Sequence, residues 1–176
     1  MRALARWLLL GVVAFLGLQL FFVGRIALMA VVDPQSTAFQ RSEAWRIATE
    51  KGRLPWRQEW VPYARISDHL KRAVIASEDD GFVNHEGVDW EALEKAWQKN
   101  AKAEEQAARR AQLAPGRARP PKIVGGSTIT QQLAKNLLLS GERTLVRKTQ
   151  EIVLTFALET LLSKERILEI YLNSVE

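Results

Sequence analysis

An uncharged apolar stretch near the amino terminus constrains this chain more than any other feature. From Trp7 to Gly24 the sequence holds mostly Leu, Val, Phe and Ala and no charged residue. A helix of that length rises about 27 Å, close to the hydrocarbon thickness of a bilayer. A cleaved signal peptide would have an apolar core of only about 7–15 residues and a small-residue cleavage site. The sequence therefore predicts a retained transmembrane anchor over residues 7–32.

The charges around the anchor predict its orientation. Arg2 and Arg6 lie in the short segment 1–6 that precedes it, and basic residues favour the cytoplasmic side of a membrane. Everything after Asp33 then lies outside the cytoplasm. Roughly 140 residues remain to build a compact core, and we expect the anchor to take no part in that core.

Composition excludes several kinds of site. The 176 residues include no cysteine, which rules out disulfides, thiol nucleophiles and thiolate metal sites. The chain has two histidines, His69 and His85, so a metal site built from several histidines is not expected. The formal net charge is +5, which favours an anionic partner such as nucleic acid, lipid headgroups or a phosphorylated substrate.

A juxtamembrane segment is expected over residues 33–66. Residues 38–50 can form a short helix. Residues 54–63 hold two prolines and two tryptophans, and they are expected to be irregular or extended. Trp56 and Trp60 fit either the headgroup zone of a bilayer or packing against the domain that follows.

Helical periodicity dominates residues 67–176, and no strand is strongly signalled. Four of the expected helices begin at a good N-cap residue: Ser67, Asp89, Thr128 and Ser163. Thr128 is also expected to form a capping box with Gln131. A long helix over 143–162 is expected to pack through a seam of Leu145, Thr149, Ile152 and Phe156. The sequence therefore predicts one mostly α-helical domain.

Residues 101–122 differ in kind from the helices around them. They are rich in Ala, Gln and Arg and then in Pro and Gly, and basic residues outnumber acidic ones. We expect a mobile basic loop whose first half can be helical. The chain stops at Glu176, a few residues past the last expected helix, so we expect the C-terminal part of the domain to be missing.

An acidic cluster closes the helix that begins near Ser67. Glu78 lies at the helix carboxyl end, where the dipole is negative, so its carboxylate should bind a proton more readily and could act as a proton acceptor near neutral pH. Asp79 and Asp80 add negative charge beside it. The alternative is a solvated acidic turn, which is common. His85 could orient a neighbouring carboxylate or hydrogen-bond a turn.

A second carboxylate lies among cations. Arg147 and Lys148 precede Glu151 by four and three residues, on one face of the expected helix, and should keep it ionised. The cluster is either an ordinary surface salt bridge or a group of charges facing an anionic ligand.

The Gly125–Gly126 pair leads into the helix that Thr128 caps. Backbone N–H groups at such a start can bind phosphate oxygens, although the spacing of a P-loop is absent. A buried capping arrangement is the alternative. Polar side chains continue along one flank of the helix: Gln131, Gln132, Lys135 and Asn136.

In this order the blocks resemble the signature of the family-51 glycosyltransferases, the peptidoglycan polymerases. Residues 78–89 match Glu-Asp-x-x-Phe-x-x-His-x-Gly-x-Asp at each fixed position, and residues 125–136 match the second motif throughout. Residues 147–151 and 164–173 resemble the third and fourth motifs. The single anchor and the Trp-Val-Pro-Tyr run at 60–63 resemble the monofunctional biosynthetic peptidoglycan transglycosylases.

The resemblance implies a lysozyme-like helical fold with a membrane-embedded jaw. It implies polymerisation of lipid II, a disaccharide-pentapeptide on undecaprenyl pyrophosphate, with the growing glycan as donor. Glu78 would take the proton from the acceptor 4-hydroxyl, and Glu151 would be the second essential acid. The implied substrate-binding residues are Asp79, His85, Ser127, Thr128, Gln131, Gln132, Lys135, Asn136, Arg147 and Lys148.

The resemblance also implies a setting. No cofactor is required; a divalent cation can assist the pyrophosphate in some members, but no ligand set in this chain demands one. The protein would lie in the bacterial inner membrane with its catalytic domain in the periplasm, and cell-wall synthesis or division proteins are candidate partners. The alternatives are a non-catalytic membrane-anchored lipid II binder, a lysozyme-like hydrolase and a basic nucleic-acid binder. No recognised binding motif supports the last of these.

Overall fold

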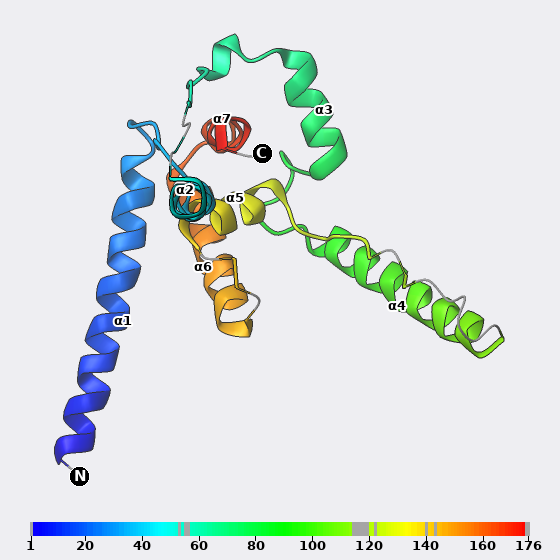
Figure 1. The fold of residues 1–176 in the computed structure, drawn as a ribbon, viewed down its shortest axis with the longest axis horizontal. Coiled ribbons are helices and arrows are strands. Elements are labelled where there is room, and N and C mark those ends of the chain that lie inside the picture. The colour runs from blue at the N-terminus through cyan, green and yellow to red at the C-terminus, as the bar shows by residue number, and fades with distance from the viewer. Residues whose placement is uncertain are drawn as a thin grey trace.

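The fold is helical throughout the part of the chain that the computed structural model describes, which is residues 2–52, 54, 57–113, 120–121, 123–139, 141–142 and 144–174. The elements are α1 (Arg2–Leu28), α2 (Ala38–Lys51), the 3-10 turn η1 (Tyr63–Arg65), α3 (Asp68–Glu78), α4 (Trp90–Leu113), α5 (Ile129–Leu138), α6 (Leu145–Leu161) and α7 (Lys164–Ser174). Figure 1 shows α5, α6 and α7 at the centre, α1 along one side and α4 projecting outward. The predicted mostly α-helical fold is confirmed.

Local capping chemistry starts several of these helices where the sequence predicts. Thr128 and Gln131 form the expected capping box at α5, and Asp89 Oδ1 accepts a hydrogen bond from Ala92 N at 2.8 Å at the start of α4. Ser67 precedes α3, but its side chain makes no capping bond. A second capping box, which the sequence analysis missed, starts α2 at Thr37.

Helix α5 is the centre of the core. Ile129, Leu133 and Leu137 recur on one face of this helix and are wholly buried, as the amphipathic pattern predicts. They pack where α5 meets α6 and α7. Because α5 is short and buried along most of its length, its polar flank is held at a fixed place in the molecule.

The seam predicted for α6 is wrong. Leu145 and Phe156 are exposed, and the buried face instead carries Glu151, Leu154, Thr155 and Leu158. A helix with apolar residues on more than one side offers two candidate seams, and periodicity alone cannot choose between them. The buried face contains the carboxylate of Glu151, and a prediction from hydrophobic periodicity places a charged residue on the surface.

Helix α1 joins the core, contrary to the prediction that the anchor stands apart from it. It is the one helix among the described residues that is long and apolar enough to cross a membrane. Most of it is exposed, but Phe22, Ile26 and Met29 belong to the central hydrophobic cluster. Gln19 and Gln150 exchange two side-chain hydrogen bonds of 3.1 and 2.9 Å, which join α1 to α6. The last turns of the anchor are therefore part of the domain.

The juxtamembrane segment largely follows its prediction. Helix α2 covers the expected residues 38–50, and residues 57–62 are irregular. Trp60 packs against the core and donates a hydrogen bond to Glu169 at 3.4 Å, so packing is the correct alternative for this residue. Trp56 lies outside the described residues.

The region predicted as a basic loop is helical in its first half, as the sequence allowed. Helix α4 continues to Leu113, well past the expected loop start at Ala101. Residues 114–119 and 122, which complete that predicted loop, lie outside the described residues.

We expect the Ile26→Ala substitution to destabilise the protein by about 2–4 kcal/mol, because Ile26 is 0% exposed and its removal leaves a cavity in the core. Leu28→Ala is the matched control, since Leu28 lies on the same helix but is 56% exposed. Unfolding followed by circular dichroism in detergent measures the difference. Equal effects of the two substitutions would mean that α1 is only a tether.

Candidate active site

The buried carboxylate of Asp79 joins the end of α3 to the start of α5. Asp79 is 8% exposed. Its Oδ1 lies 2.9 Å from His85 Nε2, and its Oδ2 accepts a hydrogen bond from Ile129 N at 2.9 Å. A carboxylate at a helix amino terminus is favoured both by the free N–H groups and by the helix dipole. The interaction fixes the neighbouring Glu78 beside α5, and it overturns the solvated-turn alternative for Asp79.

His85 both orients a carboxylate and holds a turn, the two roles left open by the sequence. Its Nδ1 accepts a hydrogen bond from Gly87 N at 3.1 Å. Nε2 therefore carries the ring hydrogen and donates a hydrogen bond to Asp79. Gly87 has φ +92°, and a Cβ there would lie 2.6 Å from Thr155. Its carbonyl also accepts a 2.6 Å hydrogen bond from the Thr128 hydroxyl. Glycine is therefore required at this position.

Glu78 is the last residue of α3, and its side chain is exposed. Its Oε2 accepts a hydrogen bond from Gln132 Nε2 at 3.0 Å. No described residue donates to its other oxygen, so that oxygen is free to accept a proton or a hydrogen bond from a ligand.

Gln132 is held from its other side by Tyr171 of α7. The Tyr171 hydroxyl donates to Gln132 Oε1 at 3.0 Å. Burial, together with the carboxylates of Glu78 and Asp79, raises the pKa of Tyr171 to about 12. The phenol therefore stays protonated across the physiological range and remains a hydrogen-bond donor.

Glu151 forms a buried ion cluster with the two cations that precede it. It is 2% exposed, which excludes an ordinary surface salt bridge. Arg147 Nη1 donates to its Oε2 at 2.7 Å, and Lys148 Nζ donates to its Oε1. Arg147 Nε is buried and has no acceptor among the described residues. A buried carboxylate with two cations leaves the cluster net positive on the side that opens to solvent.

Two neighbouring cavities lie along α5, and together they are called the groove below. One, of about 380 Å³, is lined by Ser127, Gln131, Gln132, Lys135, Arg147, Lys148 and Glu151, with Phe39 and Gly141. The other, of about 330 Å³, is lined by Glu78, Gln132, Asn136 and Tyr171, with residues of α2 and Ser174. Gln132 and Phe39 line both. The predicted acid and the predicted cation cluster therefore open onto one groove.

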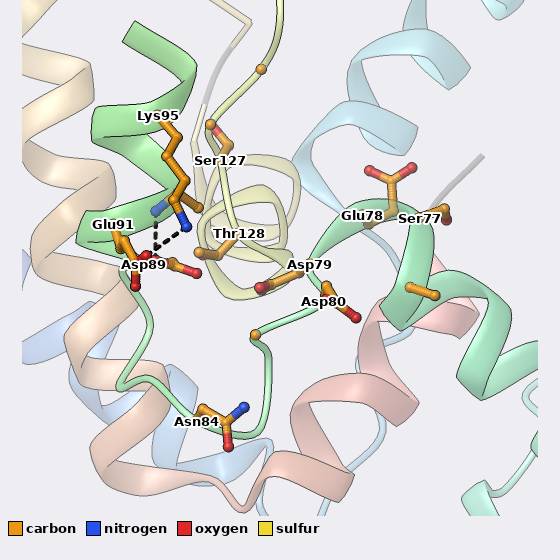
Figure 2. A pocket seen from close by; sticks show the side chains of 15 residues that line it. Ser77, Glu78, Asp79, Asp80, Asn84, Asp89, Glu91, Lys95, Ser127 and Thr128 are labelled. Atoms are coloured by element: carbon orange, nitrogen blue, oxygen red, sulfur yellow. Dashed lines mark hydrogen bonds and ion pairs between the residues drawn. The ribbon is translucent and has the colours of Figure 1, made fainter. Parts of the chain in front are cut away.

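A third cavity of about 450 Å³ lies on the other side of Glu78 (Figure 2). The charged residues of its lining are mainly acidic: Asp80 and Asp89 contribute carboxylates, and Glu91 forms an ion pair with Lys95 at 2.5 Å. Charge is thus separated across the site, with cations around Glu151 and carboxylates beyond Glu78. Among the described residues, no three His, Asp or Glu side chains are grouped so as to hold a metal ion.

The segment that leads into α5 is fixed against α4. Asn100 exchanges two hydrogen bonds with the backbone of Val124, at 3.0 and 2.8 Å. A Cβ at Gly126 would lie 3.2 Å from the side chains of Leu93 and Ala96. Gly126 therefore lets the chain approach α4 closely, and this contact sets the position of Ser127 at the site.

The residues predicted to bind substrate fall into two groups. Seven line the two neighbouring cavities: Ser127, Gln131, Gln132, Lys135, Asn136, Arg147 and Lys148. The other three, Asp79, His85 and Thr128, are engaged by the protein itself through the contacts described above. Gln131 is also held by the α5 capping box. The sequence analysis missed the contributions of Phe39 and Tyr171 to the site.

We expect the Asp79→Asn substitution to destabilise the protein by roughly 2 kcal/mol, because both oxygens accept hydrogen bonds and an amide would turn an N–H group toward one of these donors. Asp80→Asn is the control, since the neighbouring Asp80 is exposed. Denaturant unfolding of the two variants provides the comparison. An Asp79→Asn variant as stable as Asp80→Asn would contradict the bridging role.

Residues 47–176 match the family model described as Transglycosylase. Similar proteins include "Biosynthetic peptidoglycan transglycosylase" of Burkholderia thailandensis, 51% identical over 99% of this chain and 64% of that protein. Proteins of the same name in Burkholderia pseudomallei and Paraburkholderia phytofirmans are 50% and 48% identical over 99% and 97% of this chain, and over 64% and 66% of their own lengths. The chain therefore spans slightly less than two thirds of these relatives. By this match and these identities, the chain belongs to the transglycosylase family.

Proposed function

We propose that this protein is a peptidoglycan glycosyltransferase, which polymerises lipid II into glycan strands and releases undecaprenyl pyrophosphate. The observation that carries the proposal is the groove along α5, which joins a free carboxylate oxygen of Glu78 to the cations around Glu151. Inverting transfer from a pyrophosphate needs these two elements, a base for the acceptor and positive charge for the leaving group. The names of the relatives agree with this chemistry.

In the proposed reaction, Glu78 is the general base. Its unoccupied oxygen takes the proton of the 4-hydroxyl of the acceptor N-acetylglucosamine. The hydroxyl oxygen forms a bond to the anomeric carbon of the donor N-acetylmuramic acid, on the face opposite the pyrophosphate. The bond from that carbon to the pyrophosphate oxygen breaks, the oxygen keeps the electron pair, and the configuration changes from α to β.

The cations of the groove receive the leaving group. Lys135, Arg147 and Lys148 line the cavity of about 380 Å³, and we assign them to the donor pyrophosphate. The unpaired Arg147 Nε supports this assignment, since a buried donor without a partner is uncommon in folded proteins. Glu151 holds two of the cations in fixed positions. Ser127 lines the same cavity as these cations, and Asn136 lines the cavity that Glu78 lines. We assign positioning roles to Asp79, His85, Thr128 and Gln131.

The proposed setting is the inner membrane of a bacterium. We infer that α1 spans the bilayer with its amino terminus in the cytoplasm and that the domain from residue 67 onward acts in the periplasm. Exposed apolar residues of α6 support contact of the domain with lipid beside the anchor: Leu145, Val146, Val153 and Phe156. The lipid-linked substrate would then reach the groove from the membrane surface.

Orientation can be measured directly because the chain has no cysteine of its own. We expect a Glu86→Cys variant to react with a membrane-impermeant maleimide added to spheroplasts, since Glu86 is exposed on the domain. An Ala3→Cys variant should react only after lysis. The reverse labelling pattern would exclude the proposed topology.

The catalytic assignment is tested by polymerisation of purified lipid II. We expect the Glu78→Gln substitution to lower the rate at least about 100-fold, because general base catalysis typically contributes that much or more. Glu86→Gln is the matched control: it removes an exposed carboxylate of the same motif block and should keep wild-type activity. Glycan chains of normal yield from Glu78→Gln would end the assignment.

The same assay examines the second acid and the hydrolase alternative. Glu151→Gln should also abolish polymerisation, because Arg147 and Lys148 lose the anion that positions them, whereas Glu165→Gln, at an exposed site on α7, should not. Incubation with isolated cell wall should release no muropeptides. Released muropeptides would favour a lysozyme-like hydrolase.

A further inference from the structure

We propose that Tyr171 is a positioning residue for the general base, acting through the side-chain amide of Gln132. The inference rests on the proposed role of Glu78 and extends it to a residue of α7. The geometry that carries it is a continuous chain of hydrogen bonds, from the Tyr171 hydroxyl to Gln132 Oε1 at 3.0 Å and from Gln132 Nε2 to Glu78 Oε2 at 3.0 Å.

The amide of Gln132 has one donor end and one acceptor end, so its orientation decides what Glu78 meets. On the Glu78 side there are two acceptors, the Glu78 carboxylate and the Ser127 carbonyl at 3.5 Å from Nε2. On the opposite side is the Tyr171 hydroxyl, which donates to Oε1. A reversed amide would turn its oxygen toward both acceptors. The three groups together therefore select a single orientation of the amide.

Tyr171 is well suited to hold this orientation. Its side chain is 4% exposed and belongs to the hydrophobic core, so the position of the ring is fixed by packing. Its phenol stays protonated across the physiological range for the reasons given above. Glu78, in contrast, is exposed at a helix end and has three rotatable side-chain bonds. The amide N–H restricts Glu78 by binding one oxygen and leaves the other for the acceptor hydroxyl.

One consequence follows for catalysis. Without the Tyr171 hydroxyl, Gln132 can rotate, and Glu78 spends less time in the geometry that accepts the proton. This effect lowers kcat and leaves substrate binding, and therefore KM, nearly unchanged.

The test compares two tyrosine-to-phenylalanine variants in the lipid II assay, and the chain contains no third tyrosine. Tyr171→Phe keeps the ring and removes only the hydroxyl. We expect kcat to fall about 3- to 10-fold with KM nearly unchanged. Tyr63→Phe should behave as wild type, since the Tyr63 ring contacts Lys71 and its hydroxyl makes no hydrogen bond to a described residue.

A double-mutant cycle separates positioning from packing. Gln132→Met removes the amide at nearly constant length and should lower kcat at least as much as Tyr171→Phe. If Tyr171 acts through Gln132, the double variant should be no slower than Gln132→Met alone. Rate losses that multiply in the double variant would overturn the inference, as would a raised KM for Tyr171→Phe, which would indicate direct contact with substrate. If Tyr171→Phe does not fold, a wild-type kcat for Gln132→Met overturns it equally.

The outcomes distinguish this inference from the proposed function. If Glu78→Gln remains active, the general base assignment fails and the role of Tyr171 fails with it. If Glu78→Gln is inactive while Tyr171→Phe matches Tyr63→Phe in kcat, only the positioning role is excluded.

Discussion

The site depends on one buried carboxylate that serves two elements at once. Asp79 closes α3 and accepts hydrogen bonds from His85 Nε2 and from the first N–H of α5. A buried charge of this kind is costly unless hydrogen bonds satisfy it, so α3, His85 and α5 stay together or the carboxylate is left without partners. Glu78 directly precedes Asp79 and is thereby fixed at the edge of α5. The buried carboxylate of Asp79 therefore fixes the position of the exposed Glu78.

Helix α5 then organises the chemistry along its length. Its buried face anchors it between α6 and α7, while Gln132, Lys135 and Asn136 face the groove. Carboxylates lie in the cavity beyond Glu78, and the cations of α6 lie in the cavity lined by Gln131 and Lys135 of α5. This separation suits a reaction in which a proton leaves one partner and negative charge develops on the other. The carboxylates alone, or the cations alone, would assist only one of these two changes in charge.

The sequence could predict the features that depend on residues close to one another along the chain. The capping box at Thr128, the buried face of α5 and the pairing of Arg147 and Lys148 with Glu151 all follow from spacing within one helix. The burial of Glu151 and the seam of α6 depend on which helix lies against it, and spacing does not contain that information. The same holds for Tyr171, whose hydroxyl meets Gln132 only because α7 crosses α5.

The entry of the anchor into the core has a physical consequence for the proposed activity. Phe22, Ile26 and Met29 pack in the same cluster as Leu133 and Leu154, and Gln19 binds the residue that precedes Glu151. The depth of α1 in a bilayer would therefore fix the height of the groove above it. A flexible tether would let the domain move away from a membrane, whereas a packed helix would keep the cations close to the headgroups, where the pyrophosphate of the proposed lipid-linked substrate would lie.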